Sequence, residues 1–281
     1  MNSWTRNLGY VLKENPLTLV AFILFLVLLI CAVFGPLVAP YDPLATEAAR
    51  QLEPPSFAHP FGTDHLGRDI LSRVIVATRL DLGIAVSAVI LSFVLGTTLG
   101  SAAGYFGGWT DRLVGRLVDT IMAFPLFVLA MGIVAALGNT VWNIIYATAI
   151  INLPFYIRFA RAEINVRREA GYVEAARLAG NGSARILGYH LIPNILPPMM
   201  VQFSLNMGWA ILNAAGLSFI GLGVRPPTPE WGIMVSEGAN YIISGEWWVF
   251  LFPGLALVVA VFCFNLLGDG LRDIIDPRQR T

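Results

Sequence analysis

The run LTLVAFILFLVLLICAVFGPL, residues 17–37, contains no charged side chain. A helix needs about 20 mainly apolar residues to cross the hydrocarbon core of a bilayer. The run is longer than the apolar region of a secretion signal, and no A-x-A cleavage pattern follows it. We therefore expect a retained transmembrane helix, opened by Asn15-Pro16 as cap and first-turn residue.

Five further stretches have the length and apolar character of a membrane span. They are residues 83–103, 117–137, 141–159, 195–222 and 248–268. The chain of 281 residues is 56% hydrophobic and only 13% charged, about half the charged fraction of a typical soluble domain. The sequence thus predicts an all-α integral membrane protein with six transmembrane helices.

Basic residues predict the orientation of these six helices. With the N-terminus inside, the outward-facing segments hold only five of the 18 Lys and Arg residues: Arg50, Arg68, Arg73, Arg79 and Arg225. Segments on the cytosolic side of a membrane carry the excess of Lys and Arg. We therefore expect both termini in the cytosol, with two sizeable outer loops at about 38–82 and 223–247.

The composition also argues against several classes of function. A formal net charge of zero argues against a nucleic-acid partner. Cys31 and Cys263 both lie in apolar runs and form neither a disulfide framework nor a CxxC metal site. The one lysine, Lys13, is not part of a G-x-x-x-x-G-K-[ST] nucleotide-binding loop.

Charged residues deep inside the predicted spans are scarce. Carriers driven by protons or sodium usually place such groups near the middle of the membrane, and no such relay is visible here. An intramembrane enzyme would need a nucleophile–base pair or an HExxH-type site at that depth, and neither is present. If the protein moves a solute uphill, we expect the energy to come from another subunit.

The segment GYVEAARLAGNGSARILGYHLIPN, residues 171–194, interrupts the apolar pattern. Residues 172–179 favour a helix, and Gly180-Asn181-Gly182 favours its end. Three alanines, Ala175, Ala176 and Ala179, predict a flat side that a partner can approach closely. Glu174 and Arg177 lie three residues apart and can pair with each other or with the partner. The alternative is a solvated connecting helix.

Part of this segment, EAARLAG followed by IPN, resembles the EAA loop of membrane subunits of bacterial ABC importers. Glu174-Ala175-Ala176, Gly180 and Pro193 match that loop, whereas His190 and Ile192 depart from it. Four more stretches resemble the dipeptide/oligopeptide/nickel permease family, in the expected order and over nearly the whole chain. They are HPFGTDHLGRDILSRV (59–74), GYFGGWTDR (104–112), LSFIGLGVRPPTPEWG (217–232) and FPGLALVVAVFCFNLLGDGLRDIIDP (252–277). Within that family the chain is most similar to the C-type subunit.

The resemblance implies an ABC type I importer permease fold and a set of partners. A second related permease subunit would complete the pore, and two ATPase subunits would use ATP and Mg below it. An extracytoplasmic substrate-binding protein would deliver the cargo. Glu174, Ala175, Ala176, Arg177, Ala179, Gly180 and Pro193 would form the loop that couples this subunit to an ATPase. This chain itself would bind no cofactor and carry no catalytic residue.

The outer loop contains residues that support two hypotheses. His59, Asp64, His65 and Asp69 are metal-competent types, with His65 and Asp69 four residues apart. Alternatively, Gly62-Thr63-Asp64 forms a turn and a helix N-cap, and Arg68 neutralises Asp64 or Asp69. The family resemblance, carried here by Gly62, Thr63, Asp64, Gly67, Arg68 and Asp69, favours architecture or gating.

Gly96, Gly100, Gly104 and Gly108 follow one another at intervals of four residues. Such a strip of small residues lets another helix pack at close range in lipid. The partner helix would belong either to the second permease subunit or to this chain itself.

We interpret the chain as two parts. Residues 1–80 comprise a cytosolic N-terminal segment, the first transmembrane helix and an outer loop, and residues 81–281 form a permease core with a cytosolic coupling loop at about 160–195. The predicted function is one half of the pathway of an ATP-driven peptide importer in the bacterial inner membrane. Alternatives are import of nickel or another small solute such as glutathione, or a self-contained secondary carrier.

Overall fold

The computed structural model describes residues 16–275, and within this range the chain is helical, with no strand beyond one isolated bridge between Thr63 and Asp69. The elements are α2 (Pro16–Val38), the 3-10 turn η1 (Ala48–Arg50), α3 (Ile70–Phe106), α4 (Gly108–Met122), α5 (Leu126–Leu137), α6 (Val141–Arg167), α7 (Gly171–Leu178), α8 (Ser183–Arg185), the π-helical turn η2 (Ile186–Leu191), α9 (Ile192–Phe219), α10 (Trp231–Ala239) and α11 (Trp248–Ile275). The expected all-α class is confirmed for this range. The expected cytosolic segment before Pro16 lies outside the described residues.

Four helical stretches are long and apolar enough to cross a membrane: Pro16–Val38, Ile70–Phe106, Ser183–Phe219 and Trp248–Asp273. The pair α4 and α5 adds a fifth if the two helices count as one bent span. Helix α6 is not among them, because Asn143, Asn152 and Arg158 interrupt its apolar sequence. The expectation of six spans is therefore not confirmed, since the described residues give four or five.

Helices α4 and α5 meet at an angle of 87°. The sequence predicted one span over residues 117–137, and a single continuous helix there is wrong. Pro125 has no N–H to donate and disfavours a helical conformation at the residue before it, so the helix ends at Met122 and a new one begins at Leu126. Pro154, in contrast, lies inside the continuous helix α6.

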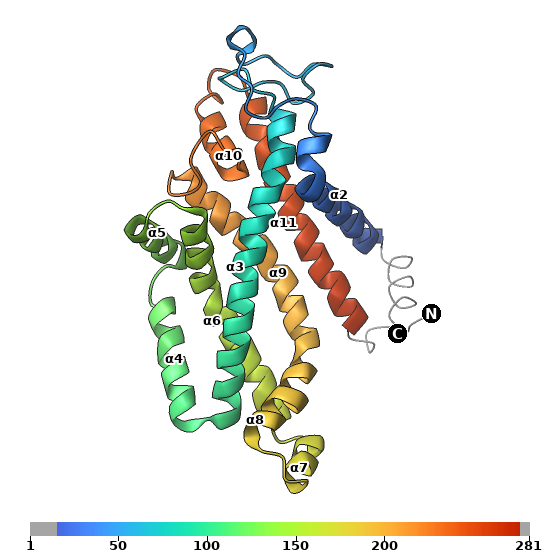
Figure 1. Ribbon diagram of the computed structural model, residues 1–281, viewed down its shortest axis with the longest axis vertical. Coiled ribbons are helices and arrows are strands. Elements are labelled where there is room, and N and C mark those ends of the chain that lie inside the picture. Colours follow the sequence, from blue (N-terminus) through green and yellow to red (C-terminus); the bar gives the residue numbers. More distant parts are fainter. Residues whose placement is uncertain (1–15, 276–281) are drawn as a thin grey trace.

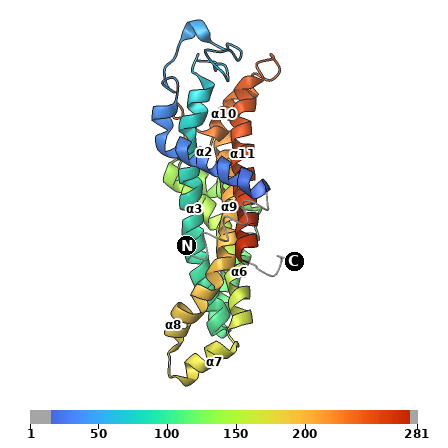
Figure 2. The ribbon, with the colours of Figure 1, turned by 90° about the vertical axis from the view of Figure 1, so that its right-hand side faces the viewer.

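The molecule is elongated, with α3, α6 and α9 running along its length (Figure 1). Helix α7 lies at one end, and the loop between α2 and α3 lies with α10 at the other, an arrangement that is also visible from the side (Figure 2). Helices α2 and α11 flank the central helices on one side, and α4 and α5 flank them on the other (Figure 1). The two ends of the long axis therefore carry different candidate sites.

Glycines bring α3 and α6 into close contact. A Cβ atom on Gly96, Gly100 or Gly104 would lie 2.4, 2.3 or 2.8 Å from the nearest atom of α6. Gly108, the first residue of α4, has no such neighbour within 4 Å. The first three glycines thus face a helix of this chain, as in the second of the two arrangements that the sequence allowed.

Candidate functional site

Backbone hydrogen bonds define the C-terminal end of helix α7. Gly180 adopts a positive φ of 80°, and its N–H donates to the Arg177 carbonyl at 2.9 Å. The backbone N–H of Asn181 donates to the Ala176 carbonyl at 3.1 Å, and its side-chain amide donates to the same oxygen at 3.0 Å. These two backbone bonds form a Schellman motif, which stops the helix and fixes the direction of the chain that leaves it. The helix and the stop signal predicted here are both present.

Helix α7 does not present all three alanines on one side, as the sequence predicted, because one of them is buried and two are exposed. Val173 and Ala176 are buried, in the same apolar cluster as residues of η2 and α9. Ala175, Leu178 and Ala179 are exposed, and Leu178 remains 84% accessible. The expectation that Ala176 shares a surface with Ala175 and Ala179 is therefore wrong, because residues 173 and 176 lie on one side of the helix and anchor it. The three-residue spacing of these two apolar residues is a signal that sequence reasoning missed.

The two charged residues of α7 do not pair with each other. Arg177 donates to the Arg168 carbonyl at 3.4 Å, and its guanidinium lies 5.9 Å from the centre of the Tyr105 ring. Glu174 is exposed and has no ion-pair partner within residues 16–275. Its carboxylate is therefore free to meet a cation of another protein. Pro193 lies in the first turn of α9, beyond η2.

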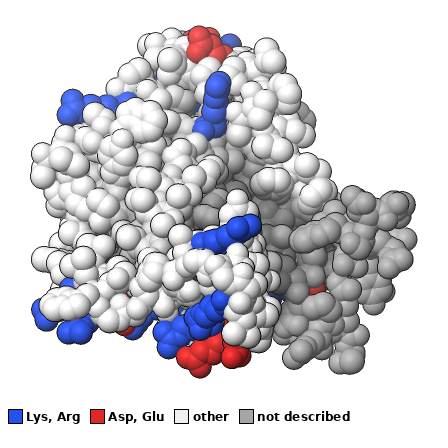
Figure 3. Space-filling view, turned by 60° about the horizontal axis from the view of Figure 1, so that its bottom comes forward, with Lys and Arg blue, Asp and Glu red and all other residues white. Residues whose placement is uncertain are grey.

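Arginine side chains gather around the end of the molecule that carries α7 (Figure 3). Arg161 of α6 makes a two-point ion pair with Asp111 of α4, with both N–O distances at 2.6 Å. Arg168 donates to the Gly104 carbonyl at 3.1 Å and so joins the ends of α6 and α3. The ends of α3, α4 and α6 near α7 are therefore rich in arginine and are joined to one another by side-chain contacts.

A buried ion-pair network holds the opposite end together. Arg68, 2% exposed, donates from Nε to an Asp64 carboxylate oxygen at 2.6 Å and from a terminal nitrogen to Glu237 of α10 at 3.3 Å. Arg73 of α3 lies 3.6 Å from the same oxygen of Asp64 and 3.8 Å from that of Glu237. The predicted neutralisation of Asp64 by Arg68 is confirmed. The network ties the outer loop, α3 and α10 to one another.

A second cluster in the same loop starts α3. Asp69 caps the helix by accepting from the backbone N–H and the hydroxyl of Ser72 at 2.8 and 2.7 Å. Its other oxygen lies 2.8 Å from Nδ1 of His59, and Arg50 lies 3.1 Å from Nε2 of that ring. Because arginine can only donate, Nε2 of His59 accepts a hydrogen bond from Arg50. Nδ1 of the same ring therefore carries the hydrogen and donates it in the hydrogen bond to Asp69. The predicted cap at Asp64 is wrong, since the cap of α3 is Asp69.

These two clusters divide the four residues of the metal hypothesis. His59 donates to Asp69 and accepts from Arg50, which leaves no free lone pair on the ring. Asp64, His65 and Glu237 do bring ligand atoms within 4.8 Å of one another. However, Arg68 and Arg73 already balance the two carboxylates. Asp64 and Glu237 are therefore better suited to hold the outer loop in place through ion pairs than to bind a metal cation.

The remaining residues of the loop motif shape its backbone. Gly62 and Gly67 have positive φ values of 72° and 75°, and a Cβ on Gly67 would lie 2.0 Å from the Glu47 carbonyl oxygen. The Thr63 hydroxyl accepts from the Glu53 N–H at 2.9 Å. The motif thus closes the loop on itself, and only glycine fits at position 67.

Two buried carboxyl groups meet where α10 begins, and no pattern in the sequence indicated this contact. Glu230 caps α10 by accepting from the backbone N–H groups of Gly232 and Ile233 at 2.9 and 2.8 Å. Its side chain is also hydrogen-bonded to Asp81 of α3, which accepts from the Trp231 N–H at 3.2 Å. Burial raises the pKa of the Glu230 carboxyl. A hydrogen bond between two carboxyl groups requires a proton between them, so the pair carries at most one negative charge while it fastens α10 to α3.

Comparisons with known proteins agree with this architecture. The family model described as binding-protein-dependent transport system inner membrane component matches residues 96–281, and one described as N-terminal TM domain of oligopeptide transport permease C matches residues 3–55. A di/tripeptide transport system permease protein of Pseudomonas aeruginosa (strain UCBPP-PA14) is 44% identical, over 92% of this chain and 88% of its own length.

Two further relatives are of similar closeness. A probable D,D-dipeptide transport system permease protein of Escherichia coli (strain K12) is 41% identical, over 96% of this chain and 91% of its own length. A glutathione transport system permease protein of Pectobacterium atrosepticum is also 41% identical, over 92% and 86%. The names of all three relatives refer to the transport of small peptides.

Proposed function

Because this chain belongs to the family of binding-protein-dependent transport system inner membrane components, we propose that α7 is the element through which an ATPase moves its membrane helices. The chain is a permease subunit of a bacterial ABC importer for peptides, a transport subunit that passes the inner membrane several times. Permeases of this family work with ATPase and substrate-binding subunits.

The finer composition of the complex is part of the proposal. A second permease subunit completes the pathway, two ATPase subunits bind ATP and Mg, and the N- and C-termini of this chain face the cytosol. Support for this orientation comes from the arginines around α7 (Figure 3), because basic residues mark the cytosolic side. Peptide cargo is favoured over nickel because the three relatives described above are named for peptide substrates, glutathione among them.

We also propose a division of labour along the chain. Residues 1–80 provide a cytosolic N-terminal segment, the first transmembrane helix and an outer loop, and residues 81–281 form the permease core. The loop motif from Gly62 to Asp69 fastens the outer end, so that a binding protein meets a rigid surface. Buried ion pairs between Asp64, Arg68 and Glu237 support this role.

The observation that carries the coupling role is the two-faced packing of α7. Val173 and Ala176 anchor the helix to the chain, and the Schellman motif fixes its end. Ala175 and Ala179 are exposed on another side of the helix, where their short side chains let a partner approach closely. A rigidly mounted helix with a small-residue surface transmits the displacement of a partner, whereas a loosely tethered one absorbs it.

Single cysteines at Ala175 and Ala179 test this role, in a chain whose Cys31 and Cys263 are replaced by alanine. Each variant is co-expressed with its ATPases, which carry single cysteines along the surface that faces the permease. We expect crosslinks at both positions whose yield changes between nucleotide-free and ATP-trapped complexes. Cysteine at Ala176 is the matched control, because its side chain is buried within this chain and should give no crosslink.

Two results would overturn the coupling role. One is equal crosslinking at all three positions, and the other is a yield that does not respond to nucleotide. Transport by this chain alone, driven by a proton gradient, would instead support the secondary-carrier alternative.

A further inference from the structure

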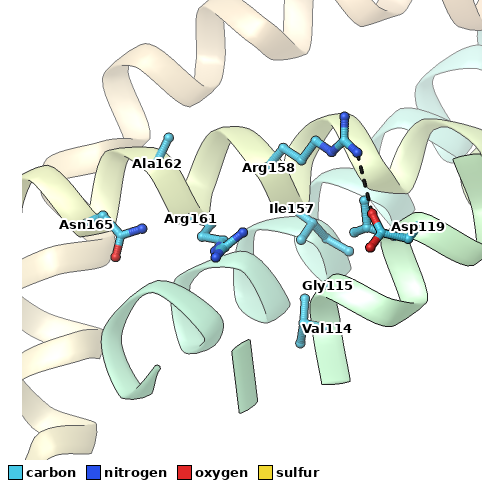
Figure 4. A pocket seen from close by; sticks show the side chains of 9 residues that line it. Val114, Gly115, Asp119, Ile157, Arg158, Arg161, Ala162 and Asn165 are labelled. Atoms are coloured by element: carbon cyan, nitrogen blue, oxygen red, sulfur yellow. Dashed lines mark ion pairs between the residues drawn. The ribbon is translucent and has the colours of Figure 1, made fainter. Parts of the chain in front are cut away.

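A cavity of about 410 Å³ lies between α4 and α6 and contains two charged groups that are only loosely paired. Figure 4 shows Arg158, Arg161 and Asn165 along α6, with Gly115 and Asp119 on the facing helix α4. The volume falls in the range of small-molecule sites, about 300–1,000 Å³.

The two ion pairs between these helices differ in geometry. Arg161 and Asp111 form a close ion pair, with 2.6 Å between the guanidinium nitrogen and the carboxylate oxygen. Arg158 and Asp119 lie 3.8 Å apart, and their side chains are 55% and 74% exposed. Charge-assisted hydrogen bonds are about 2.7–2.9 Å long, so neither group of the second pair is satisfied by the other. Arg158 and Asp119 are therefore available to a ligand that offers both charges.

The position of this pair along the helices argues that it faces water. Arg158 precedes the end of α6 at Arg167 by nine residues, which places it about 13 Å inward from the basic end. Asp119 lies about 16 Å from the start of α4 at Gly108. Arg158 and Asp119 thus lie at the inner ends of the spans expected over residues 141–159 and 117–137, and their side chains are exposed. The cavity between α4 and α6 therefore opens to water near the inner ends of these spans.

We propose that the cavity is a binding subsite on the translocation pathway for a zwitterionic small peptide; this inference rests on the proposed function. Arg158 binds the terminal carboxylate, and Asp119 binds the terminal ammonium. A dipeptide extends about 7 Å at most, which exceeds the 3.8 Å between Arg158 and Asp119, so the pair must open to bind both ends of the peptide.

The other walls of the cavity fit the rest of such a ligand. Val118 and Ile157 form a buried apolar floor that can receive a side chain. Asn165 offers both a donor and an acceptor at the rim, as a peptide bond requires. Gly115 has no side chain and nothing within 4 Å of where one would begin, which keeps the cavity open.

The test traps a photoreactive dipeptide, alanyl-photo-leucine, in the complete importer during ATP-driven uptake in proteoliposomes. Uptake by the wild-type complex is measured first, and its absence would count against the proposed function rather than against the subsite. We expect photo-adducts on residues 114–119 or 157–165. Loss of one charge-assisted contact weakens binding by about tenfold or more, so Arg158→Gln and Asp119→Asn should each lower the adduct yield by about that factor.

Two controls distinguish loss of the site from loss of the fold. Arg112→Gln removes a charge at the same end, where the guanidinium lies 4.8 Å from the Trp109 ring, and should leave the yield unchanged. Arg158→Lys keeps the charge and should retain adducts that Arg158→Gln loses. Copurification of the partner subunits with each variant shows that the complex has assembled.

Zwitterionic phospholipid headgroups offer the same pair of charges, so the bilayer composition is varied. Vesicles of phosphatidylglycerol and cardiolipin contain no zwitterionic lipid, and in them the adducts and their dependence on Arg158 should persist. Adducts that map only elsewhere, a yield unchanged in both charge variants, or a variant effect that appears only with phosphatidylethanolamine would overturn the peptide subsite.

Discussion

Replacing Gly100 by alanine should force α3 and α6 apart. The new Cβ would lie 2.3 Å from the Ile157 carbonyl oxygen and 3.0 Å from the Ala160 Cβ. Neither neighbour can move alone, because one is backbone and the other is attached directly to it. The two helices must therefore shift relative to each other to admit a single methyl group.

The size of the effect follows from two opposing contributions. Overpacking of a tight core typically costs about 1–3 kcal/mol. Alanine gains up to about 1 kcal/mol over glycine in helix propensity. We expect Gly100→Ala to lower the free energy of unfolding by about 1–2 kcal/mol. Gly83→Ala, in the same helix but with nothing within 4 Å, should be neutral or slightly stabilising.

Both variants can be measured by unfolding the purified chain in mixed micelles with increasing SDS. The comparison within one helix removes differences of detergent and helix propensity, so that only the close contact with α6 remains. Equal midpoints for the two variants would refute the packing argument. A larger loss of unfolding free energy for Gly83→Ala than for Gly100→Ala would contradict the packing argument outright.

Three further substitutions test the ends of the molecule. Arg68→Met leaves the buried carboxylate of Asp64 with weaker compensation and should cost about 3–5 kcal/mol, measured in the same SDS unfolding assay. Burial raises the pKa of Glu230, so its contribution to stability is full at low pH and is lost as the pH rises through the folded-state pKa. Unfolding midpoints should therefore decline as the pH rises above the usual glutamate value of about 4.3, and Glu230→Gln should flatten that decline. Ala176→Trp should destabilise the chain because the side chain is buried, whereas Ala179→Trp should leave the unfolding midpoint unchanged and abolish uptake.

The spans that sequence reasoning placed well are those with uninterrupted apolar runs. Residues 17–37 were expected as a span and form α2, Pro16–Val38, because a long uncharged run has few alternatives to a membrane helix. The bend at Pro125 divides the single span that was expected over residues 117–137. Its angle depends on the packing of α5 against α6, which no local pattern records.

Candidate-site residues were predictable where the interaction is local. Arg68 and Asp64 lie four residues apart, and the sequence anticipated their ion pair. Asp81 and Glu230 are brought together by the tertiary fold alone, and neither lies in a recognisable pattern of charges. The orientation of Ala176 was missed for the same reason, since its buried neighbours come from η2 and α9.

The ion pairs at the two ends of the molecule differ in burial, and this difference bears on which part can move. Separating the buried Arg68 from Asp64 would leave uncompensated charges inside the protein, which is costly. Separating Arg158 from Asp119 exposes groups that are already more than half in contact with solvent, and such exposed pairs contribute about 0–1 kcal/mol. Motion that starts at α7 therefore meets less resistance at the Arg158–Asp119 pair than at the buried pairs that hold α10. We infer that the outer end moves as one body, while the end near α7 changes its internal geometry during transport.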